Sequence, residues 1–213
     1  MTPELEDYIE RHISPQPPWL KDVDRKTNLY QINGRMCSGH IQGRILKMIA
    51  AMINPSRVLE LGTFTGYSAL CIAEAIGKDA VIDTIEADDE LEDVILKNFA
   101  ASPYGEKITL HIGDALELLD NWHDETFDLI LIDADKREYS KYFEKTLPLL
   151  KTGGFIVADN TLWDGHVVET GKHSSQTEGI LQFNNHVAQN PKVEVAIIPV
   201  RDGISLIRKK EES

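Results

Sequence analysis

The 213-residue sequence has little cysteine, little basic charge and no long apolar run. Its two cysteines, Cys37 and Cys71, are too few and too far apart for a disulfide framework or a zinc site, and they favour a cytoplasmic protein with reduced thiols. No apolar stretch approaches the roughly 18–20 residues of a membrane span, and the acidic first residues do not resemble a signal peptide.

Basic residues are outnumbered: 22 Lys+Arg stand against 35 Asp+Glu, which gives a formal net charge of −13. A surface this acidic repels phosphate backbones and anionic lipids, so we expect neither a nucleic-acid nor a membrane partner. The hydrophobic fraction of 42% indicates a folded globular chain rather than a disordered one.

Strand and helix patterns alternate regularly from residue 58 onward. Runs of strand length occur at 58–61, 81–85, 108–112, 127–132, 155–158, 193–200 and 204–208. Helical patterns lie at 3–13, 41–53, 68–76, 90–100, 115–121, 141–149 and 177–189, and a polar segment follows the proline cluster at 15–18. Such alternation indicates a mostly parallel sheet with helices on both faces.

The last two predicted strands flank Arg201-Asp202-Gly203, a sequence typical of a hairpin, so the final strand is expected to run antiparallel. The predicted fold class is α/β: a Rossmann-like, doubly wound seven-stranded sheet with extra N-terminal helices. We expect a single domain over residues 1–213, in which 1–55 is a helical extension and 56–213 is the Rossmann-like core.

The segment VLELGTFTGYS at 58–68 predicts a buried strand, a glycine turn and a helix start. Such a turn presents backbone N–H groups and a helix N-terminus to a ligand. Gly62 and Gly66 are present, but Phe64 stands where dinucleotide folds place the glycine that admits a pyrophosphate. The turn therefore disfavours NAD and FAD and allows a nucleoside cofactor such as S-adenosylmethionine.

Ligands of an open α/β sheet bind at the carboxyl ends of its strands. The first predicted strand ends at Gly62 and Thr63, and the second at Glu86, whose carboxylate can accept both ribose hydroxyls. The third strand ends near residues 113–115, a candidate adenine contact.

Three oxygen-bearing side chains follow the fourth and fifth predicted strands: Asp133, Asp159 and Asn160. If these strands are neighbours, about 4.7–4.9 Å apart, the side chains converge at one point. Two carboxylates and an amide oxygen suit Mg²⁺, with Ca²⁺ or Mn²⁺ as alternatives, and do not suit zinc. The competing interpretation is that these acids only cap the following helices.

Lys136 follows Asp133 closely, and a lysine beside a metal and a sulfonium has a lowered pKa and can act as a base. The alternative is a surface lysine that pairs with Asp135. Trp163, His166 and His173 come soon after the predicted metal ligands, within or next to the polar segment 165–178, which is a candidate substrate lid.

Five segments in this order resemble those of a known family: VLELGTFTGYS at 58–68, GDA at 113–115, LIDADK at 131–136, DNTLW at 159–163 and PVRDG at 199–203. The chain resembles the cation-dependent class I O-methyltransferases of the caffeoyl-CoA and catechol O-methyltransferase group, bacterial branch, over about residues 36–208.

The resemblance implies metal ligation by Asp133, Asp159 and Asn160, and a catalytic role for Lys136 as the base and for Asp133. The expected S-adenosylmethionine contacts are Met36, Ser38, Glu60, Gly62, Thr63, Ser68, Glu86, Ala115, Asp133 and Asp135. The family is usually a homodimer, with N-terminal helices at the interface and the substrate pocket.

The sequence also departs from the family pattern. Gly39, His40 and Ile41 replace Ser, Pro and Glu, and Asp164 stands where plant enzymes carry a substrate-contacting Asn. These differences leave methyl transfer intact and leave the acceptor open.

The sequence thus predicts a methyltransferase that acts on a vicinal dihydroxy-aromatic small molecule. One alternative is a protein that binds S-adenosylmethionine or S-adenosylhomocysteine without catechol methyltransferase activity. The other is an NAD-dependent oxidoreductase, which Phe64 and the acidic cluster disfavour.

Overall fold

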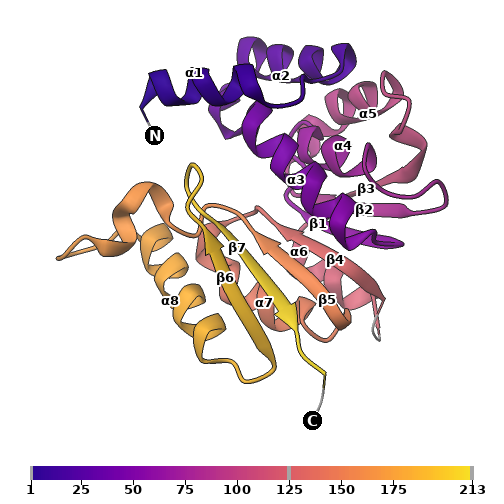
Figure 1. Cartoon of the computed structure of the whole chain (residues 1–213). Coiled ribbons are helices and arrows are strands. Elements are labelled where there is room, and N and C mark those ends of the chain that lie inside the picture. The colour runs from indigo at the N-terminus through magenta and orange to yellow at the C-terminus, as the bar shows by residue number, and fades with distance from the viewer. Residues whose placement is uncertain (1, 124–125, 212–213) are drawn as a thin grey trace.

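Strands and helices alternate along the chain as the sequence predicts (Figure 1). The computed structural model describes residues 2–123 and 126–211. The strands are β1 (Arg57–Leu61), β2 (Val81–Glu86), β3 (Ile108–Ile112), β4 (Phe127–Ile132), β5 (Leu150–Ala158), β6 (Val193–Ile198) and β7 (Ile204–Lys209). The α-helices are α1 (Pro3–His12), α2 (Pro18–Tyr30), α3 (Gly39–Ile53), α4 (Tyr67–Ala73), α5 (Glu92–Ala100), α6 (Ala115–Leu118), α7 (Tyr139–Thr146) and α8 (Ser175–Gln189).

The seven strands form one sheet in the order β3-β2-β1-β4-β5-β7-β6. Strands β1 to β5 pair in parallel, whereas β7 is antiparallel to both β5 and β6. The predicted fold class is confirmed, including the antiparallel C-terminal strand. β4 and β5 are direct neighbours, which is the condition on which the predicted acidic cluster depends.

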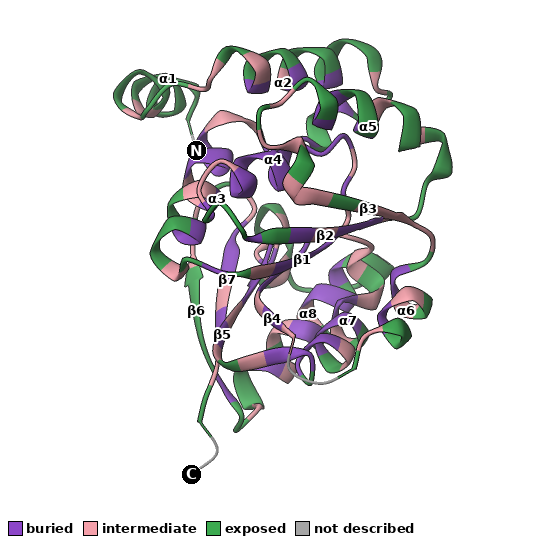
Figure 2. Ribbon diagram, turned by 90° about the vertical axis from the view of Figure 1, so that its right-hand side faces the viewer, coloured by how far each residue is buried: buried purple, intermediate pink, exposed green. Residues whose placement is uncertain are grey.

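Helices pack on both faces of the sheet (Figure 2). On one face, α7 and α8 contribute Phe143 and Phe183 to a core with Ile130 of β4. On the other, α3 and α4 contribute Ile49 and Ile72 to a second core. Central strands covered on both faces must be apolar nearly throughout, which explains why β1 and β4 lack strict alternation of polar and apolar residues.

Helix α2 was not predicted, because the proline cluster at 15–18 indicated only the end of α1. Pro18 instead occupies the first position of α2. A backbone N–H at this position has no acceptor within the helix, so proline loses no helical hydrogen bond there. The helix buries Leu20, Val23 and Thr27, and the Thr27 hydroxyl lies 2.8 Å from that of Thr65 in the glycine turn. The N-terminal extension therefore contacts the glycine turn directly.

The predicted lid segment 165–178 is partly regular. The segment Trp163–Val168 contains 3₁₀ turns interrupted by non-helical backbone at Asp164 and Gly165, and α8 already begins at Ser175, with Ser174 as its N-cap. Residues 169–174 lie between these elements and belong to no helix or strand. No helix among the described residues is long and apolar enough to cross a bilayer.

Candidate functional site

A cavity of about 1380 Å³ opens at the carboxyl ends of the parallel strands. Pockets for a single small molecule usually measure roughly 300–1,000 Å³, so this cavity has room for two ligands side by side. The predicted site residues that line it are Met36, Ser38, Gly62, Thr63, Ser68, Glu86, Ala115, Asp133, Asp135, Lys136, Asp159 and Asn160. Glu60 is the one predicted residue that does not reach the cavity wall.

The glycine turn after β1 is held close to the end of β4. A side chain at Gly62, whose φ is +98°, would overlap the carbonyl oxygen of Asp133. Phe64 also has a positive φ, +51°, and its N–H donates to Oε2 of Glu86 at 2.7 Å. The turn is therefore fixed against both β4 and β2, with Phe64 in the cavity wall.

Glu60 is fully buried beneath this turn. The Ser68 hydroxyl donates to Oε1 at 2.6 Å and the Thr84 hydroxyl donates to Oε2 at 2.5 Å. Burial raises the pKa of Glu60 to about 7. The structure thus gives Glu60 a supporting position beneath Ser68, and direct contact between Glu60 and a cofactor stays a prediction.

Glu86 and Ala115 lie at the ends of neighbouring strands. The two carboxylate oxygens of Glu86 accept the N–H groups of Phe64, at 2.7 Å, and Asp88, at 3.0 Å, so its orientation is set by the backbone. Asp114 caps α6 by accepting the N–H of Leu116 at 2.7 Å, which places Ala115 in the cavity wall. Both residues line the cavity, and their contacts with a ribose and an adenine stay predictions.

The predicted acidic cluster forms where β4 and β5 end. Ile132 pairs with Ala158 in the sheet register, so Asp133 and Asp159 follow as neighbours. Asp159 is only 5% exposed. Burial, with the nearby charge of Asp133, raises the pKa of Asp159 well above its ordinary value.

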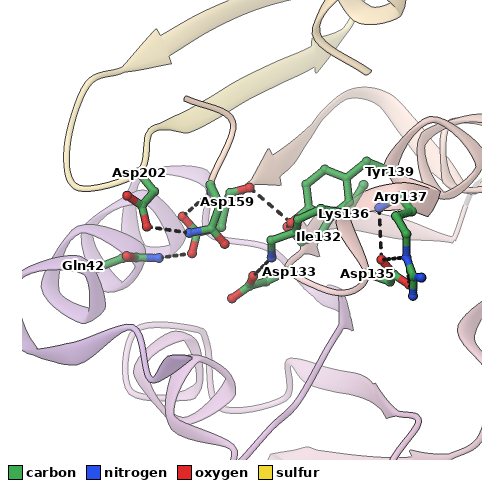
Figure 3. Close-up of polar contacts among 10 residues, drawn as sticks. Gln42, Ile132, Asp133, Asp135, Lys136, Arg137, Tyr139, Asp159 and Asp202 are labelled. Atoms are coloured by element: carbon green, nitrogen blue, oxygen red, sulfur yellow. Dashed lines mark hydrogen bonds and ion pairs between the residues drawn. The ribbon is translucent and has the colours of Figure 1, made fainter. Parts of the chain in front are cut away.

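Lys136 pairs with Asp133, not with Asp135. Its Nζ lies 2.7 Å from Oδ1 of Asp133, whereas Asp135 forms an ion pair with Arg137 (Figure 3). The surface-pair interpretation of Lys136 is therefore wrong. Burial disfavours the ammonium form, but the Asp133 carboxylate outweighs it and raises the pKa of Lys136. The predicted lowering of that pKa needs additional positive charge beside Lys136.

Helix capping does not account for the two acids either. The side chain of Asp135, not of Asp133, accepts the N–H at the start of the 3₁₀ segment Lys136–Glu138. Oδ1 of Asp159 accepts the N–H of Asn160 at 2.7 Å. Asp133 and Asp159 thus line the cavity and do not cap a helix end.

Two further polar residues, Gln42 and Asp202, belong to this cluster and were not predicted. Gln42 of α3 donates from Nε2 to Oδ2 of Asp159 at 2.5 Å, and Asn160 donates from Nδ2 to Oδ2 of Asp202 at 3.4 Å (Figure 3). The available signal for Gln42 was its spacing from Ile45 and Leu46, which places it on the buried face of a helix.

A family model described as O-methyltransferase matches residues 10–210. The chain belongs to the O-methyltransferase family. This confirms the resemblance carried by the five sequence segments. This O-methyltransferase is similar to the caffeoyl-CoA O-methyltransferase of Petroselinum crispum, with 31% identity over 218 residues that cover 96% of this chain and 90% of the relative.

Solved structures of other methyltransferases have the same fold. The SAH-bound methyltransferase PaMTH1 of Podospora anserina matches with a TM-score of 0.90 and 26% identity, over 98% of this chain and 94% of that one. The O-methyltransferase of Bacillus cereus in complex with SAH matches with a TM-score of 0.87 and 25% identity, over 97% of each chain.

The acidic cluster of this O-methyltransferase fits a hard cation through its oxygen atoms. Within residues 2–123 and 126–211, no group of three or more His, Cys, Asp and Glu side chains is placed to hold a metal ion. A third side-chain ligand beside Asp133 and Asp159 would have to be of another type, such as an amide or a hydroxyl oxygen. Asn160 meets this need, because Nδ2 faces Asp202 and Oδ1 is left as an acceptor.

Proposed function

We propose that the protein transfers the methyl group of S-adenosylmethionine to a hydroxyl of a catechol-type small molecule, with a divalent cation beside the acceptor oxygens. One observation carries the proposal: two carboxylates and a lysine meet in the cavity formed beside the glycine turn. Caffeoyl groups have adjacent aromatic hydroxyls, so the similarity to a caffeoyl-CoA O-methyltransferase supports this acceptor class.

The cofactor is assigned to the half of the cavity around the glycine turn. Glu86 would accept the ribose hydroxyls, because its carboxylate is already oriented by two backbone N–H groups. Gly62, Thr63 and Ser68 also line the cavity, with Met36 and Ser38 from the segment before α3. The two SAH-bound structures of similar fold support S-adenosylmethionine as the cofactor.

The cation is assigned to Asp133, Asp159 and Asn160, and Mg²⁺ suits these oxygen ligands best. When bound, such a cation lowers the pKa of an acceptor hydroxyl near it. The chain's own contribution is electrostatic. Asp133 and Asp159 lie together in a largely buried part of the cavity, and of the two only Asp133 pairs with a lysine, Lys136.

Lys136 is assigned the handling of the proton on the reacting hydroxyl. Its raised pKa keeps Nζ in the ammonium form beside Asp133, so it donates a hydrogen bond to the acceptor oxygen as negative charge develops there. With added positive charge in the site, the same nitrogen gives up its proton more readily and can act as a general base.

The site must also orient the aromatic acceptor relative to the methyl group. Trp163 lies in the cavity wall after β5 and provides a flat surface for an aromatic ring. Holding the acceptor oxygen in line with the methyl sulfonium accounts for a large part of the rate, because it removes the entropy cost of their encounter.

We propose a homodimer in the cytoplasm, in which the extension 1–55 contributes to the interface and the pocket. Large apolar side chains are exposed on the extension, including Leu29, Ile32, Met48 and Met52, and dimerisation would cover part of them. The two buried thiols, Cys37 and Cys71, are free, which is consistent with a reducing compartment.

The experiment is a measurement of S-adenosylhomocysteine release from S-adenosylmethionine with Mg²⁺ and matched pairs of acceptors. Vicinal dihydroxy-aromatics should turn over, and isomers with separated hydroxyls should not. Cofactor binding without turnover of any catechol would instead support a binding protein. Equal turnover of both isomer types would reject the need for adjacent oxygens.

A further inference from the structure

We propose that Gln42 is a positioning residue that fixes the Asp159 carboxylate in the orientation required for cation binding. The inference deepens the proposed function and rests on it, since it assigns a partner to one of the proposed ligands. It also gives helix α3, which belongs to the N-terminal extension, a direct part in the site.

The contact is buried and spans the chain. Gln42 and Asp159 are 3% and 5% exposed, and the 2.5 Å hydrogen bond joins residues from α3 and from the end of β5 (Figure 3). Burying a polar side chain without a hydrogen-bond partner costs free energy of folding, so Gln42 and Asp159 each hold the other in place.

The hydrogen bonds of Asp159 leave oxygen lone pairs available. Gln42 donates to Oδ2, and the backbone N–H of Asn160 donates to Oδ1 at 2.7 Å. A carboxylate has about four lone-pair sites, so one on each oxygen is taken and one on each stays open. Two donors at fixed positions therefore set the plane of the carboxylate without saturating it.

The charge of the partner matters as well. Asp133 has an ammonium partner, Lys136, at 2.7 Å, whereas Gln42 is a neutral donor. A neutral donor orients Asp159 without cancelling its charge. With Asp159 ionised, the cluster of Asp133, Asp159 and Lys136 carries one negative charge in excess in a largely buried place, where a divalent cation is attracted more strongly than in water.

The test is calorimetric titration of Mg²⁺ into the full-length protein with S-adenosylhomocysteine present. Gln42→Met has nearly the same length and no donor. We expect its Mg²⁺ affinity to fall by about 10-fold or more, as for other residues that orient metal ligands, with S-adenosylhomocysteine affinity changed by less than about 2-fold.

Thr146→Val is the matched control. It also removes a buried side-chain hydrogen bond, from the Thr146 hydroxyl to the Tyr142 carbonyl at 2.7 Å, but at the far end of α7 from Lys136. It should lower the melting temperature and leave Mg²⁺ affinity unchanged. If Gln42→Met does not fold, Gln42→Asn, whose shorter amide cannot reach Asp159, gives the same readout.

A double-mutant cycle separates positioning from general loosening of the fold. If Gln42 acts through Asp159, adding Gln42→Met to Asp159→Asn causes no further loss of Mg²⁺ affinity. Wild-type affinity in a folded Gln42→Met protein, or additive losses in the cycle, would overturn the inference alone. Absence of Mg²⁺ binding by the wild-type protein would reject the metal-dependent function and this inference with it.

Discussion

Nζ of Lys136 lies 2.7 Å from Oδ1 of Asp133, in the wall of the cavity that the glycine turn also lines. The pair connects the two halves of the site, because the backbone of Asp133 packs against Gly62 while its side chain faces Lys136. A proton-carrying group is thereby held next to the place assigned to the cofactor.

Replacing Lys136 should therefore slow the chemistry without weakening the cofactor complex. We expect Lys136→Met to lower kcat for a catechol by about 10²- to 10⁴-fold, the usual contribution of a positioned acid or base. S-adenosylhomocysteine affinity, measured by calorimetry, should stay near the wild-type value. Lys141→Met, which removes an exposed ion pair with Glu138, is the control and should keep wild-type kcat. Undiminished kcat in Lys136→Met would exclude Lys136 from proton handling.

The buried Glu60 should give the protein a specific pH dependence of stability. Its pKa is raised by burial from 4.5 to about 7, so the folded state binds this proton more tightly than the unfolded state. The contribution of Glu60 to stability is therefore fully present below about pH 4.5 and is lost as the pH rises through about 7.

Glu60→Gln removes this titration. The free energy of unfolding of the wild-type protein, minus that of Glu60→Gln, should fall between pH 4.5 and 8 by about 3 kcal/mol at most. Urea unfolding at several pH values measures the difference. A difference that is constant over this range would show that Glu60 titrates normally.

Gly62 should be far less replaceable than another glycine with a positive φ. Gly62 and Gly171 both have positive φ, but an added Cβ overlaps the Asp133 carbonyl at Gly62 and meets nothing within 4 Å at Gly171. Gly171→Ala should cost about 1 kcal/mol of unfolding free energy, and Gly62→Ala more than about 3 kcal/mol. Equal losses in chemical denaturation would show that the close approach at Gly62 is relieved at little cost.

The sheet and the residues at its strand ends could be predicted because both depend on local patterns. Short apolar runs separated by helical patterns fix an α/β alternation, and the position of Asp133 or Asp159 directly after a run places it at the edge where ligands bind. The prediction needed only one assumption about topology, the adjacency of β4 and β5, which the structure confirms.

The residues that were missed depend on contacts between distant parts of the chain. Nothing in the sequence near Gln42 indicates that it meets Asp159, because that contact exists only once α3 packs beside the end of β5. The resemblance implies a cofactor contact for Glu60, which stays a prediction, but nothing near Glu60 in the sequence indicates its hydrogen bond with Thr84. The prolines at 15–18 lie between two helices, and only the burial of Leu20 and Val23 shows that Pro18 begins the second one.

Asp133, Asp159 and Asn160 are proposed to serve methyl transfer through a divalent cation. The most direct test measures S-adenosylhomocysteine formation from a catechol by the EDTA-treated protein, before and after Mg²⁺ is added back. We expect turnover to disappear with EDTA and return with Mg²⁺ in the wild-type protein, and not to return in Asp159→Asn. Full turnover by the wild-type protein in EDTA would contradict the claim.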